Sequence, residues 1–410
     1  MSVSNTSPFK SALVINSYAN GLGVIRSIAK TGLKLPVYAA DHTKFQATFY
    51  SRYLSGKFVL PKVFNDQFIP NLIDVGKRIS NQHGGRCLLC PVNDEYVLMF
   101  AKHWDELEPW FYPMFTTDFD ILNPCVDKNL ICKLAEKVEV PFPRSASSLK
   151  EFVELGLSFP AVIKPLLRRS PAAIQKGVFR IEFADSANEA KGPTRLLEKL
   201  DEPYIMQEFI PGGDNELYTA GIASFNGQTI ATYSGRKVRQ YPPTTGIAAF
   251  AETVFEPRVV EYGKRLLEYA RYTGISQVEF KKSNDEFYLM EINPRPWLWN
   301  SLATQSGKNL VGEFIRCAME GDSYEVEKET NSQRNGVQWM SVLNDLEHNV
   351  ICNRNIGFFR WLGCVWTSRC KSYWSWTDPM PGLVATLLKA VFLFRRIVKR
   401  LIGWGKHRTD

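Results

Sequence analysis

Two glutamates, Glu279 and Glu291, have the residue type and the spacing to hold a metal ion. They lie in a segment that predicts a strand, a polar turn over Ser283–Glu286 and a second strand. If the turn centres on Asp285, the glutamates face each other, where cross-strand Cβ atoms are only about 4.5–5.5 Å apart. Two like charges so close destabilise a hairpin unless something compensates them. We therefore expect a divalent cation between the carboxylates.

Because side chains alternate along a strand, Asn293 and Arg295 share the face of Glu291. Two carboxylates and an amide oxygen are hard ligands that suit Mg2+, which keeps its other positions for water and phosphate. Arg295 adds a permanent positive charge suited to phosphate or a developing acyl phosphate. A solvated hairpin face is the alternative, but the E-x-N-x-R spacing with apolar residues strictly between favours the metal site. The residues predicted to face the core are Val278, Phe280, Met290 and Ile292.

Patterns near the N-terminus predict a βαβ unit and hence a parallel sheet. The predicted strand, glycine-containing loop, helix and strand are Ser11–Asn16, Asn20–Gly23, Val24–Lys30 and Leu35–Ala40. A later strand over Cys87–Val92 ends in Asn93 and precedes a helix over Tyr96–Leu107. Ligands of open α/β sheets bind at the carboxyl ends of the strands. We therefore expect a substrate site on one rim, formed by Gly21, Gly23, Asp94 and Glu95.

A proline-rich stretch, Pro109–Pro124, predicts a boundary before a region of mixed helices and strands. The predicted strands are Ala161–Pro165, Tyr204–Ile210, Leu217–Ser224, Gln228–Tyr233, Ile275–Lys281 and Phe287–Asn293. The predicted helices are Asp127–Val138, Ala187–Leu200, Pro257–Arg271 and Leu310–Glu320. This mixture indicates an α+β nucleotide domain. The expected units are a substrate lobe (1–118), this domain (119–325), a C-terminal extension (326–380) and a basic tail (381–410).

Glu279, followed by Glu291 within Met290–Arg295, resembles the metal-binding end of the ATP-grasp enzymes. That superfamily includes biotin carboxylase, carbamoyl phosphate synthetase, D-alanine–D-alanine ligase and D-aspartate ligase. The likeness covers roughly Ser11 to Glu320 and is to the carboxylate–amine ligases in particular. It implies a Rossmann-like α/β lobe, termed pre-ATP-grasp, followed by an α+β ATP-grasp domain. It also implies ATP and Mg2+, with Mn2+ as an alternative ion.

The resemblance assigns phosphate-binding roles to several basic residues. Lys128 starts the helix that opens the ATP-grasp region and would touch phosphate. Lys164, on a strand and followed by proline, would hold the α- and β-phosphates. Many ATP-grasp enzymes cradle phosphate with a glycine-rich flap, which is nearly absent from this sequence. Arg168, Arg169 and Lys176 would grip phosphate there instead.

The resemblance also predicts where the nucleoside binds. The hinge Glu208-Phe209-Ile210 would hold adenine through backbone atoms and the Glu208 carboxylate. An acidic residue a few positions later would hold the ribose, and both Asp214 and Glu216 are candidates.

The implied reaction is an ADP-forming ligation of a small-molecule carboxylate to an amine. The carboxylate would attack the γ-phosphate, and the amine would displace phosphate from the acyl phosphate. Lys164 would offset charge, and Arg295 would stabilise the oxyanion. The basic residues of the segment Gly235–Arg239, which are Arg236, Lys237 and Arg239, are expected to face the phosphates or the acyl acceptor. Dimers are common among similar enzymes, which leaves a homodimer as one assembly to consider.

Two other functions remain candidates. Gly21 and Gly23 follow a strand and Asp41 lies about 20 residues on, as in dinucleotide-dependent oxidoreductases. Arg26, however, occupies the third glycine position. The second alternative is a non-catalytic Mg-ATP-binding regulator or membrane-tethered scaffold, and the intact glutamate pair disfavours it.

Charge and cysteine usage narrow the protein class. The net charge is +8, but residues 381–410 hold seven Lys/Arg and one acid, so the rest carries only +2. A nucleic-acid-binding protein would be expected to spread basic residues over a folded face, so nucleic acid is not expected as a partner.

Cys87 and Cys90 form a C-x-x-C inside a predicted buried strand, which favours plain thiols over zinc or redox chemistry. Scattered cysteines and a polar start without a secretory signal predict a cytoplasmic protein.

Residues 381–404 predict an amphipathic helix. Its apolar run before Arg395 is about 13 residues, short of the roughly 20 needed to cross a bilayer. Such a helix is typical of an in-plane anchor on the anionic inner face of the membrane, and a helix docked on the protein is equally consistent. The basic face comprises Lys389, Arg396 and Arg400, and the apolar face Leu387, Val391, Phe394 and Val398.

Overall fold

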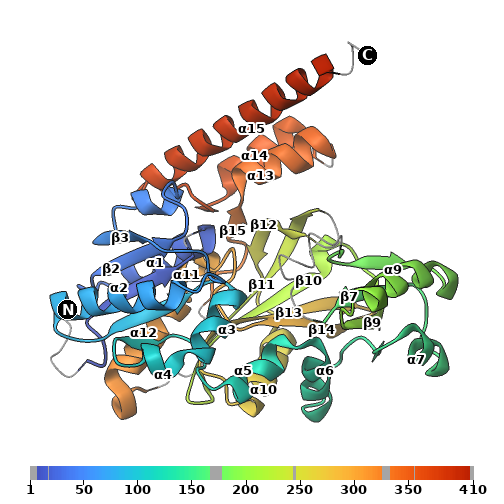
Figure 1. Ribbon diagram of the computed structural model, residues 1–410, viewed down its shortest axis with the longest axis horizontal. Coiled ribbons are helices and arrows are strands. Elements are labelled where there is room, and N and C mark those ends of the chain that lie inside the picture. Colours follow the sequence, from blue (N-terminus) through green and yellow to red (C-terminus); the bar gives the residue numbers. More distant parts are fainter. Residues whose placement is uncertain are drawn as a thin grey trace.

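A five-stranded parallel sheet forms the N-terminal lobe of the computed structural model (Figure 1). The structure describes residues 7–16, 18–166, 178–242, 246–325, 333–354 and 356–406. In sheet order the strands are β3 (Gly56–Val59), β2 (Val37–Asp41), β1 (Ser11–Ile15), β4 (Cys87–Pro91) and β5 (Phe111–Pro113). The connecting helices are α1 (Ala19–Ala29), η1 (Ala47–Tyr50), α2 (Phe68–His83), α3 (Asp94–Lys102) and α4 (Trp104–Leu107).

The helix after β1 begins earlier than the sequence predicts. We expected a loop over Asn20–Gly23, but α1 starts at Ala19 and includes both glycines. A Cβ added at Gly23 would lie 2.5 Å from the Asn300 Oδ1 atom, so this glycine permits close packing of the helix. The G-x-G pair therefore does not form a phosphate-binding loop, and the oxidoreductase alternative loses its main support.

A seven-stranded sheet forms the centre of the second half of the chain. In sheet order its strands are β14 (Glu286–Asn293), β13 (Gly274–Ser283), β10 (Leu217–Phe225), β11 (Gln228–Tyr241), β12 (Ile247–Thr253), β15 (Gln338–Met340) and β16 (Cys370–Lys371). Its pairs are antiparallel except β15 with β16. The associated helices are α10 (Pro257–Tyr269), α11 (Ser301–Ser306) and α12 (Leu310–Glu320).

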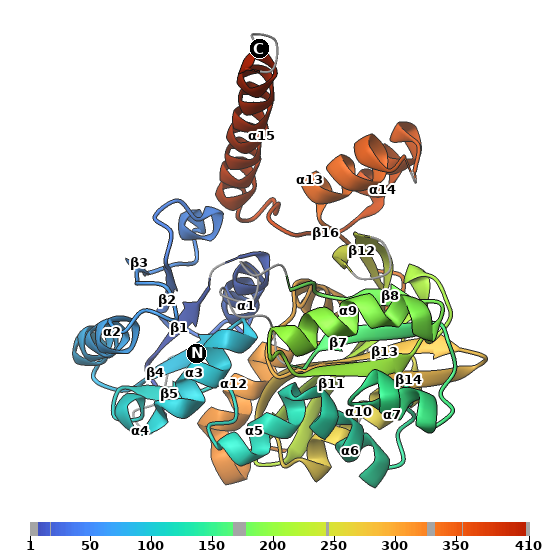
Figure 2. The same cartoon turned by 45° about the vertical axis from the view of Figure 1, so that its right-hand side comes forward.

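A smaller antiparallel sheet of four strands lies beside the large one (Figure 2). In sheet order its strands are β6 (Ser145–Ala146), β9 (Tyr204–Glu208), β7 (Ala161–Pro165) and β8 (Glu182–Ala184). Its own hydrophobic core, which includes Phe152, Ile163 and Leu197, packs it against two helices. The helices of this region are α5 (Phe119–Val126), α6 (Lys128–Lys137), α7 (Leu149–Glu154) and α9 (Ala187–Lys199).

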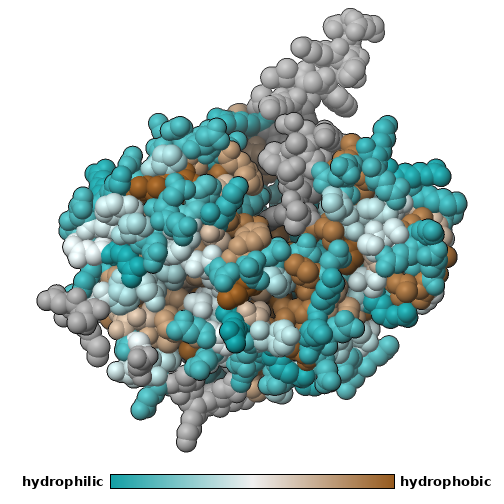
Figure 3. Space-filling model, turned by 60° about the horizontal axis from the view of Figure 1, so that its bottom comes forward, coloured by the Kyte–Doolittle hydropathy of each residue, from teal (hydrophilic) through white to brown (hydrophobic). Residues whose placement is uncertain are grey.

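The larger cores join elements from both halves of the chain. One core contains Leu13 and Leu89 of the parallel sheet together with Phe280 of β13. A second contains Val14 together with Trp297. On the face shown in Figure 3, hydrophilic atoms dominate the rim and hydrophobic atoms gather towards the middle.

Sequence patterns predicted many of these elements closely. β7 and α12 have the predicted bounds, and α6 differs by a single residue at each end. The 16-residue helix α2 was not predicted. In the large sheet, the differences include β11, which continues to Tyr241, and β12, which was not predicted. Both run beside other strands, so pairing within the sheet sets their length.

The C-terminal extension adds strands β15 and β16 to the large sheet, with three helices between these strands and a fourth after β16. Those helices are α13 (Val342–Asp345), the π-helix η4 (Leu346–Cys352), α14 (Phe358–Thr367) and α15 (Met380–Lys406). Figures 1 and 2 show that α15 projects away from the sheets. None of the helices in the described part of the chain combines the length and the apolar character that a membrane-spanning segment needs.

Candidate active site

Strands β13 and β14 form the predicted hairpin, and Glu279 pairs directly with Glu291. The turn residues Asn284 and Asp285 both have positive φ, 47° and 62°, as a two-residue hairpin turn of type I′ requires. The register then shifts by one residue between Glu279 and Phe280. This bulge brings the two glutamates opposite each other although the turn centres between Asn284 and Asp285.

The bulge also changes which side chains of β14 enter the core. We expected Met290 to face the core with Ile292, but Met290 is only partly buried. Leu289 is 2% exposed and pairs with Phe280, so it takes the core position instead. The expectation for Met290 was wrong because a bulge inserts one unpaired residue and reverses the alternation of faces.

Protein groups compensate the charges of both glutamates. The Lys237 Nζ atom lies 2.8 Å from the Glu279 Oε2 atom, and both side chains are buried. The Asn293 amide donates a hydrogen bond of 3.0 Å to the Glu291 Oε1 atom. A cation between the carboxylates is therefore not required to explain why the pair is tolerated, which corrects the expectation from sequence.

The environment moves the pKa values of the two glutamates in opposite directions. Burial raises the pKa of Glu279, with the Glu291 charge adding to the shift and Lys237 opposing it. Burial by the surrounding protein also acts to raise the pKa of Glu291, although part of this residue remains exposed. The hydrogen bond from Asn293 and the charges of Lys237 and Arg295 outweigh that effect, so the pKa of Glu291 is lowered. Ionisation is therefore favoured more strongly at Glu291 than at Glu279.

Arg295 joins this hairpin to the N-terminal lobe. Its Nε and Nη2 atoms lie 2.7 and 3.3 Å from the two carboxylate oxygens of Asp94, at the start of α3. The Nη2 atom also donates to the Asn293 Oδ1 atom at 2.9 Å. Asp94 thus reaches the site as the partner of Arg295, while the neighbouring Glu95 is half-buried.

Lys128 and Lys164 approach the same site from two other elements. Asp127 caps α6 through hydrogen bonds from two backbone N–H groups, which fixes Lys128 at the first helical position. The Lys128 Nζ atom donates to the carbonyl oxygens of Pro165 and Leu166 at 2.8 and 2.7 Å. The Lys128 amine therefore sits beside the end of β7.

Electrostatic effects show that both amines are close to Glu291. Burial and the nearby Lys164 charge lower the pKa of Lys128 to about 8, while Glu291 opposes this shift. Burial also lowers the pKa of Lys164, and Glu291 again opposes the shift. Both amines thus act electrostatically on Glu291, which faces Glu279 across the hairpin.

Gln207 occupies a place that sequence reasoning gave to Glu208. Side chains alternate along β9, so Gln207 shares the face of Lys164 and its Oε1 atom accepts a hydrogen bond of 3.1 Å from the Lys164 Nζ atom. The Glu208 carboxylate points to the opposite face and accepts a hydrogen bond from the Ser158 backbone. A one-residue step along a strand reverses the direction of a side chain, so Glu208 lies on the face away from Lys164, and its contact with adenine stays a prediction.

The backbone around the predicted hinge has its own partners. The Phe209 N–H donates to the Pro160 carbonyl oxygen at 2.9 Å, and its ring packs edge-on against Phe183. Ile210 follows just beyond the end of β9 and is half-buried.

The loop after the hinge separates the two ribose candidates. Both carboxylate oxygens of Asp214 accept hydrogen bonds from Gln240, through its backbone N–H at 3.1 Å and its side chain at 2.9 Å. Glu216 accepts a single hydrogen bond, from the exposed side chain of Asn215. Lys281 fixes the loop by donating to two glycine carbonyl oxygens. Glu216 is thus more available to a ligand than Asp214.

Arg239 does not reach the charged groups around Glu291. Its guanidinium forms a two-pronged ion pair with the buried Asp345, at 3.0 and 2.7 Å, and lies over the Phe250 ring. The Arg239 guanidinium is therefore already paired with a fully buried carboxylate of α13, which does not support the substrate role expected for it. Lys237 on the same strand is the basic residue that enters the site.

The remaining predicted site residues have other surroundings. Gly21 and Gly23 are buried inside α1, where a Cβ added at Gly21 would lie 3.1 Å from the Asn16 carbonyl oxygen. These positions allow close packing of the helix, and neither lies in the loop that the sequence predicted. Lys176, together with Arg168 and Arg169, lies outside the described residues.

The donor set at the hairpin fits a magnesium ion that also binds phosphate. Glu279, Glu291 and Asn293 supply hard oxygen atoms within one patch. Within the described ranges, no group of three or more His, Cys, Asp or Glu side chains could hold a metal, so further ligands would have to come from water or phosphate. As placed, Asn293 directs its NH2 group to Glu291, so its amide would have to rotate to offer oxygen.

The surroundings of the C-x-x-C motif favour neither metal binding nor redox chemistry. Cys87 and Cys90 are fully buried in β4, and burial raises the pKa of Cys87 to about 12. Burial also holds the pKa of Cys90 well above its usual range. Both groups are therefore protonated thiols, as their place in a buried strand predicts.

Comparison with solved structures places this arrangement in a known fold. No protein-family model matches the sequence. Biotin carboxylase from Campylobacter jejuni superposes with a TM-score of 0.62 over 82% of this chain and 75% of that chain, at 14% sequence identity. The chain has the ATP-grasp fold.

Two further ATP-grasp structures give the same result. An L-amino acid ligase from Bacillus licheniformis gives a TM-score of 0.57 over 81% of this chain and 79% of that chain, at 15% identity. The N5-carboxyaminoimidazole ribonucleotide synthetase purK, solved as its ADP complex, gives 0.56 over 76% and 77%, at 16% identity. At such identities the likeness concerns the fold, and the chemistry has to be inferred from the site.

Proposed function

We propose that this protein is an ATP-dependent ligase that activates a small-molecule carboxylate as an acyl phosphate and joins it to an amine. The observation that carries the proposal is the cluster of Glu279, Glu291, Lys128 and Lys164 at one place in an ATP-grasp fold. One structural neighbour is an L-amino acid ligase by name, and one biotin carboxylase domain was solved with MgADP and bicarbonate.

Glu279, Glu291 and Asn293 would hold Mg2+, which when bound neutralises phosphate charge during phosphoryl transfer. The lowered pKa of Glu291 keeps this ligand ionised at neutral pH. Lys237 would keep Glu279 oriented, since their 2.8 Å contact fixes one carboxylate oxygen and leaves the other to a cation.

Lys164 and Lys128 would neutralise the phosphates of ATP from the side of the small sheet. Lys164 is oriented by Gln207, and Lys128 by the two carbonyl groups at the end of β7. Gln207 also faces the space that adenine would occupy, with Phe209 and Ile210 as the adjoining hinge. Glu216 would hold the ribose, because Asp214 already binds Gln240 through both oxygens.

Arg295 would stabilise the oxyanion that forms when the amine attacks the acyl phosphate. Asp94 holds the guanidinium in place from the N-terminal lobe. Burial acts to lower the pKa of Arg295, but the charges of Asp94 and the two glutamates outweigh burial and raise this pKa overall. Substrates would then lie between this lobe and the hairpin, near α3. Small-molecule acids and amines are the partners that such a site would take.

Phosphate release from ATP, screened over amino acids, dipeptides and polyamines with Mg2+, tests the proposal. Glu291→Ala and Lys164→Ala should each lower turnover by about a hundredfold or more, since each removes charge stabilisation of the transferred phosphoryl group. The matched control is Lys150→Ala with Glu154→Ala, an exposed ion pair on α7, which should retain normal turnover. Normal turnover in Glu291→Ala would refute the assignment.

The same screen separates a ligase from a non-catalytic regulator. A regulator would show a thermal shift with Mg-ATP, abolished by Lys164→Ala, but no ATP consumption with any acid and amine. A ligase would release phosphate only when both substrates are present.

A further inference from the structure

The C-terminal helix α15 carries a stripe of large apolar side chains on its surface. Leu383, Leu387, Val391 and Phe394 are between 42% and 66% exposed. Their spacing places them on one face of the helix. Side chains this apolar are seldom left together in water, so the stripe indicates an interaction surface.

The opposite face of α15 contacts the protein. The Lys389 Nζ atom lies 2.5 Å from a Glu347 carboxylate oxygen and donates to the Asn344 side chain at 3.3 Å. Turning the apolar stripe towards the body of the protein would break both contacts. The stripe therefore faces outwards as a consequence of how the helix is held.

Exposed aromatic side chains lie on neighbouring segments of the same end of the molecule. Phe359 and Trp366 on α14 are 86% and 91% exposed, and Trp376, just before α15, is fully exposed. Figures 1 and 2 both show α13, α14 and α15 beyond the sheets at this end. Tryptophan and phenylalanine are typical residues of the membrane–water interface.

The charge of this region identifies the surface that it fits. Residues 381–410 carry a net charge of +6, whereas the remaining chain carries only +2. We propose that α15, with the exposed aromatic residues of α14, binds an anionic lipid surface in the plane of the membrane. Self-association through the stripe would bring two such basic tails together, which their mutual repulsion opposes.

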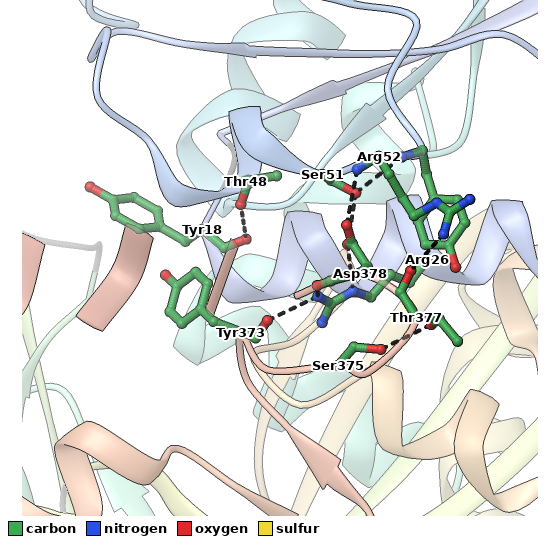
Figure 4. Close-up of polar contacts among 10 residues, drawn as sticks. Tyr18, Arg26, Thr48, Ser51, Arg52, Tyr373, Ser375, Thr377 and Asp378 are labelled. Carbon is green, nitrogen blue, oxygen red and sulfur yellow. Dashed lines mark hydrogen bonds and ion pairs between the residues drawn. The ribbon is translucent and has the colours of Figure 1, made fainter. Parts of the chain in front are cut away.

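A buried carboxylate fixes the start of this helix on the N-terminal lobe (Figure 4). The Asp378 carboxylate accepts hydrogen bonds from the Arg26 Nε, Ser51 Oγ and Arg52 backbone N atoms, at 3.0, 2.8 and 2.9 Å. Arg26 also donates to the Tyr373 carbonyl oxygen at 2.9 Å. Lipid binding through α15 would therefore orient the whole N-terminal lobe relative to the membrane.

Flotation of the full-length protein with vesicles tests this proposal. Vesicles of phosphatidylcholine with about one third phosphatidylglycerol should carry the protein upwards, and pure phosphatidylcholine should carry much less. The triple variant Leu387→Glu, Val391→Glu, Phe394→Glu should bind the anionic vesicles about tenfold more weakly or worse. Raised salt should also weaken binding of the unmodified protein, because it screens the basic residues.

The matched control places the same charges on exposed apolar residues elsewhere, as Val153→Glu, Leu155→Glu, Tyr269→Glu. If the control loses binding as fully as the α15 variant, net charge alone drives the effect and the stripe has no role. Equal binding of the α15 variant and the unmodified protein would likewise overturn the proposal. The proposal would also be overturned if light scattering without lipid detected a dimer that the α15 variant converts to a monomer. Circular dichroism melts confirm that each variant is folded.

Discussion

At the scale of single residues, the contact between Lys237 and Glu279 determines how two facing carboxylates fit into a folded hairpin. Both side chains are buried, and their charged atoms lie 2.8 Å apart. A buried ion pair contributes little net stability, but removing one partner leaves an uncompensated buried charge. The pair is therefore a sensitive point for stability as well as for the site.

Lys237→Met should lower the free energy of unfolding by about 3 kcal/mol, because Glu279 then remains buried without its partner. Combining it with Glu279→Gln should recover most of the loss, since no buried charge remains. Urea denaturation without added Mg2+ measures both values. Lys150→Met on the exposed surface is the control, and a loss no larger than in this control would contradict the prediction.

Lys128 should make nucleotide binding dependent on pH, because burial and Lys164 lower its pKa to about 8. As the pH rises through this value, the amine loses its proton and its attraction for phosphate. We expect affinity for Mg-ATP to fall about fivefold to tenfold between about pH 7.5 and about pH 9. Isothermal titration calorimetry at several pH values measures this change.

Lys128→Arg should flatten that dependence, since a guanidinium stays protonated throughout the range. Any pH dependence of Mg-ATP affinity that remains in this variant would be attributed to Lys164, whose pKa is also lowered by burial. An unchanged slope in Lys128→Arg would show that another group titrates.

At the scale of elements, the β13–β14 hairpin depends on its turn and its bulge together. The two-residue turn sets one register, and the bulge shifts it so that Glu279 meets Glu291. The left-handed conformation of Asn284 and Asp285 is one that Asn, Asp and Gly adopt with little strain.

Asn284→Ala should reduce the free energy of unfolding by about 1 kcal/mol, because alanine is strained at positive φ. Asn284→Gly, the matched control, should be within about 0.5 kcal/mol of the unmodified protein. Urea denaturation distinguishes them, and equal stability of the two variants would show that the turn does not set the register.

At the scale of the whole molecule, a few long-range ion pairs join the lobes and the C-terminal extension. Asp94 with Arg295 links the N-terminal lobe to the hairpin, and Arg239 with Asp345 links β11 to α13. Asp378 with Arg26 links the segment before α15 to α1. Each pair joins elements that are distant in sequence, so they fix the relative placement of the parts.

Asp378→Ala should release the segment over residues 372–380 from the N-terminal lobe. Three hydrogen bonds are lost and Arg26 loses its carboxylate partner, which should cost about 2–4 kcal/mol of local stability. Hydrogen exchange should become faster in peptides that cover this segment, including the start of α15. Ser375→Ala is the control, because the Ser375 hydroxyl hydrogen-bonds to Thr377 within the same segment. Unchanged exchange in Asp378→Ala would show that the carboxylate is not the anchor.

The sequence by itself determined the features that depend on local pattern. The alternation of apolar and polar residues gave the strand that carries Lys164, the helix that begins at Lys128 and the β13–β14 hairpin, but the pairing of Glu279 with Glu291 depends on a bulge that this alternation does not predict. These features follow from the periods of strands and helices and from turn chemistry, which are properties of short segments.

Tertiary structure alone decided which polar groups meet. Lys237 reaches Glu279 across 42 positions, and Arg239 is taken by Asp345 across 106 positions. The choice of Gln207 over Glu208 depended on which face of β9 meets Lys164. Such contacts arise from sheet order and packing between distant segments, and no local pattern carries that information.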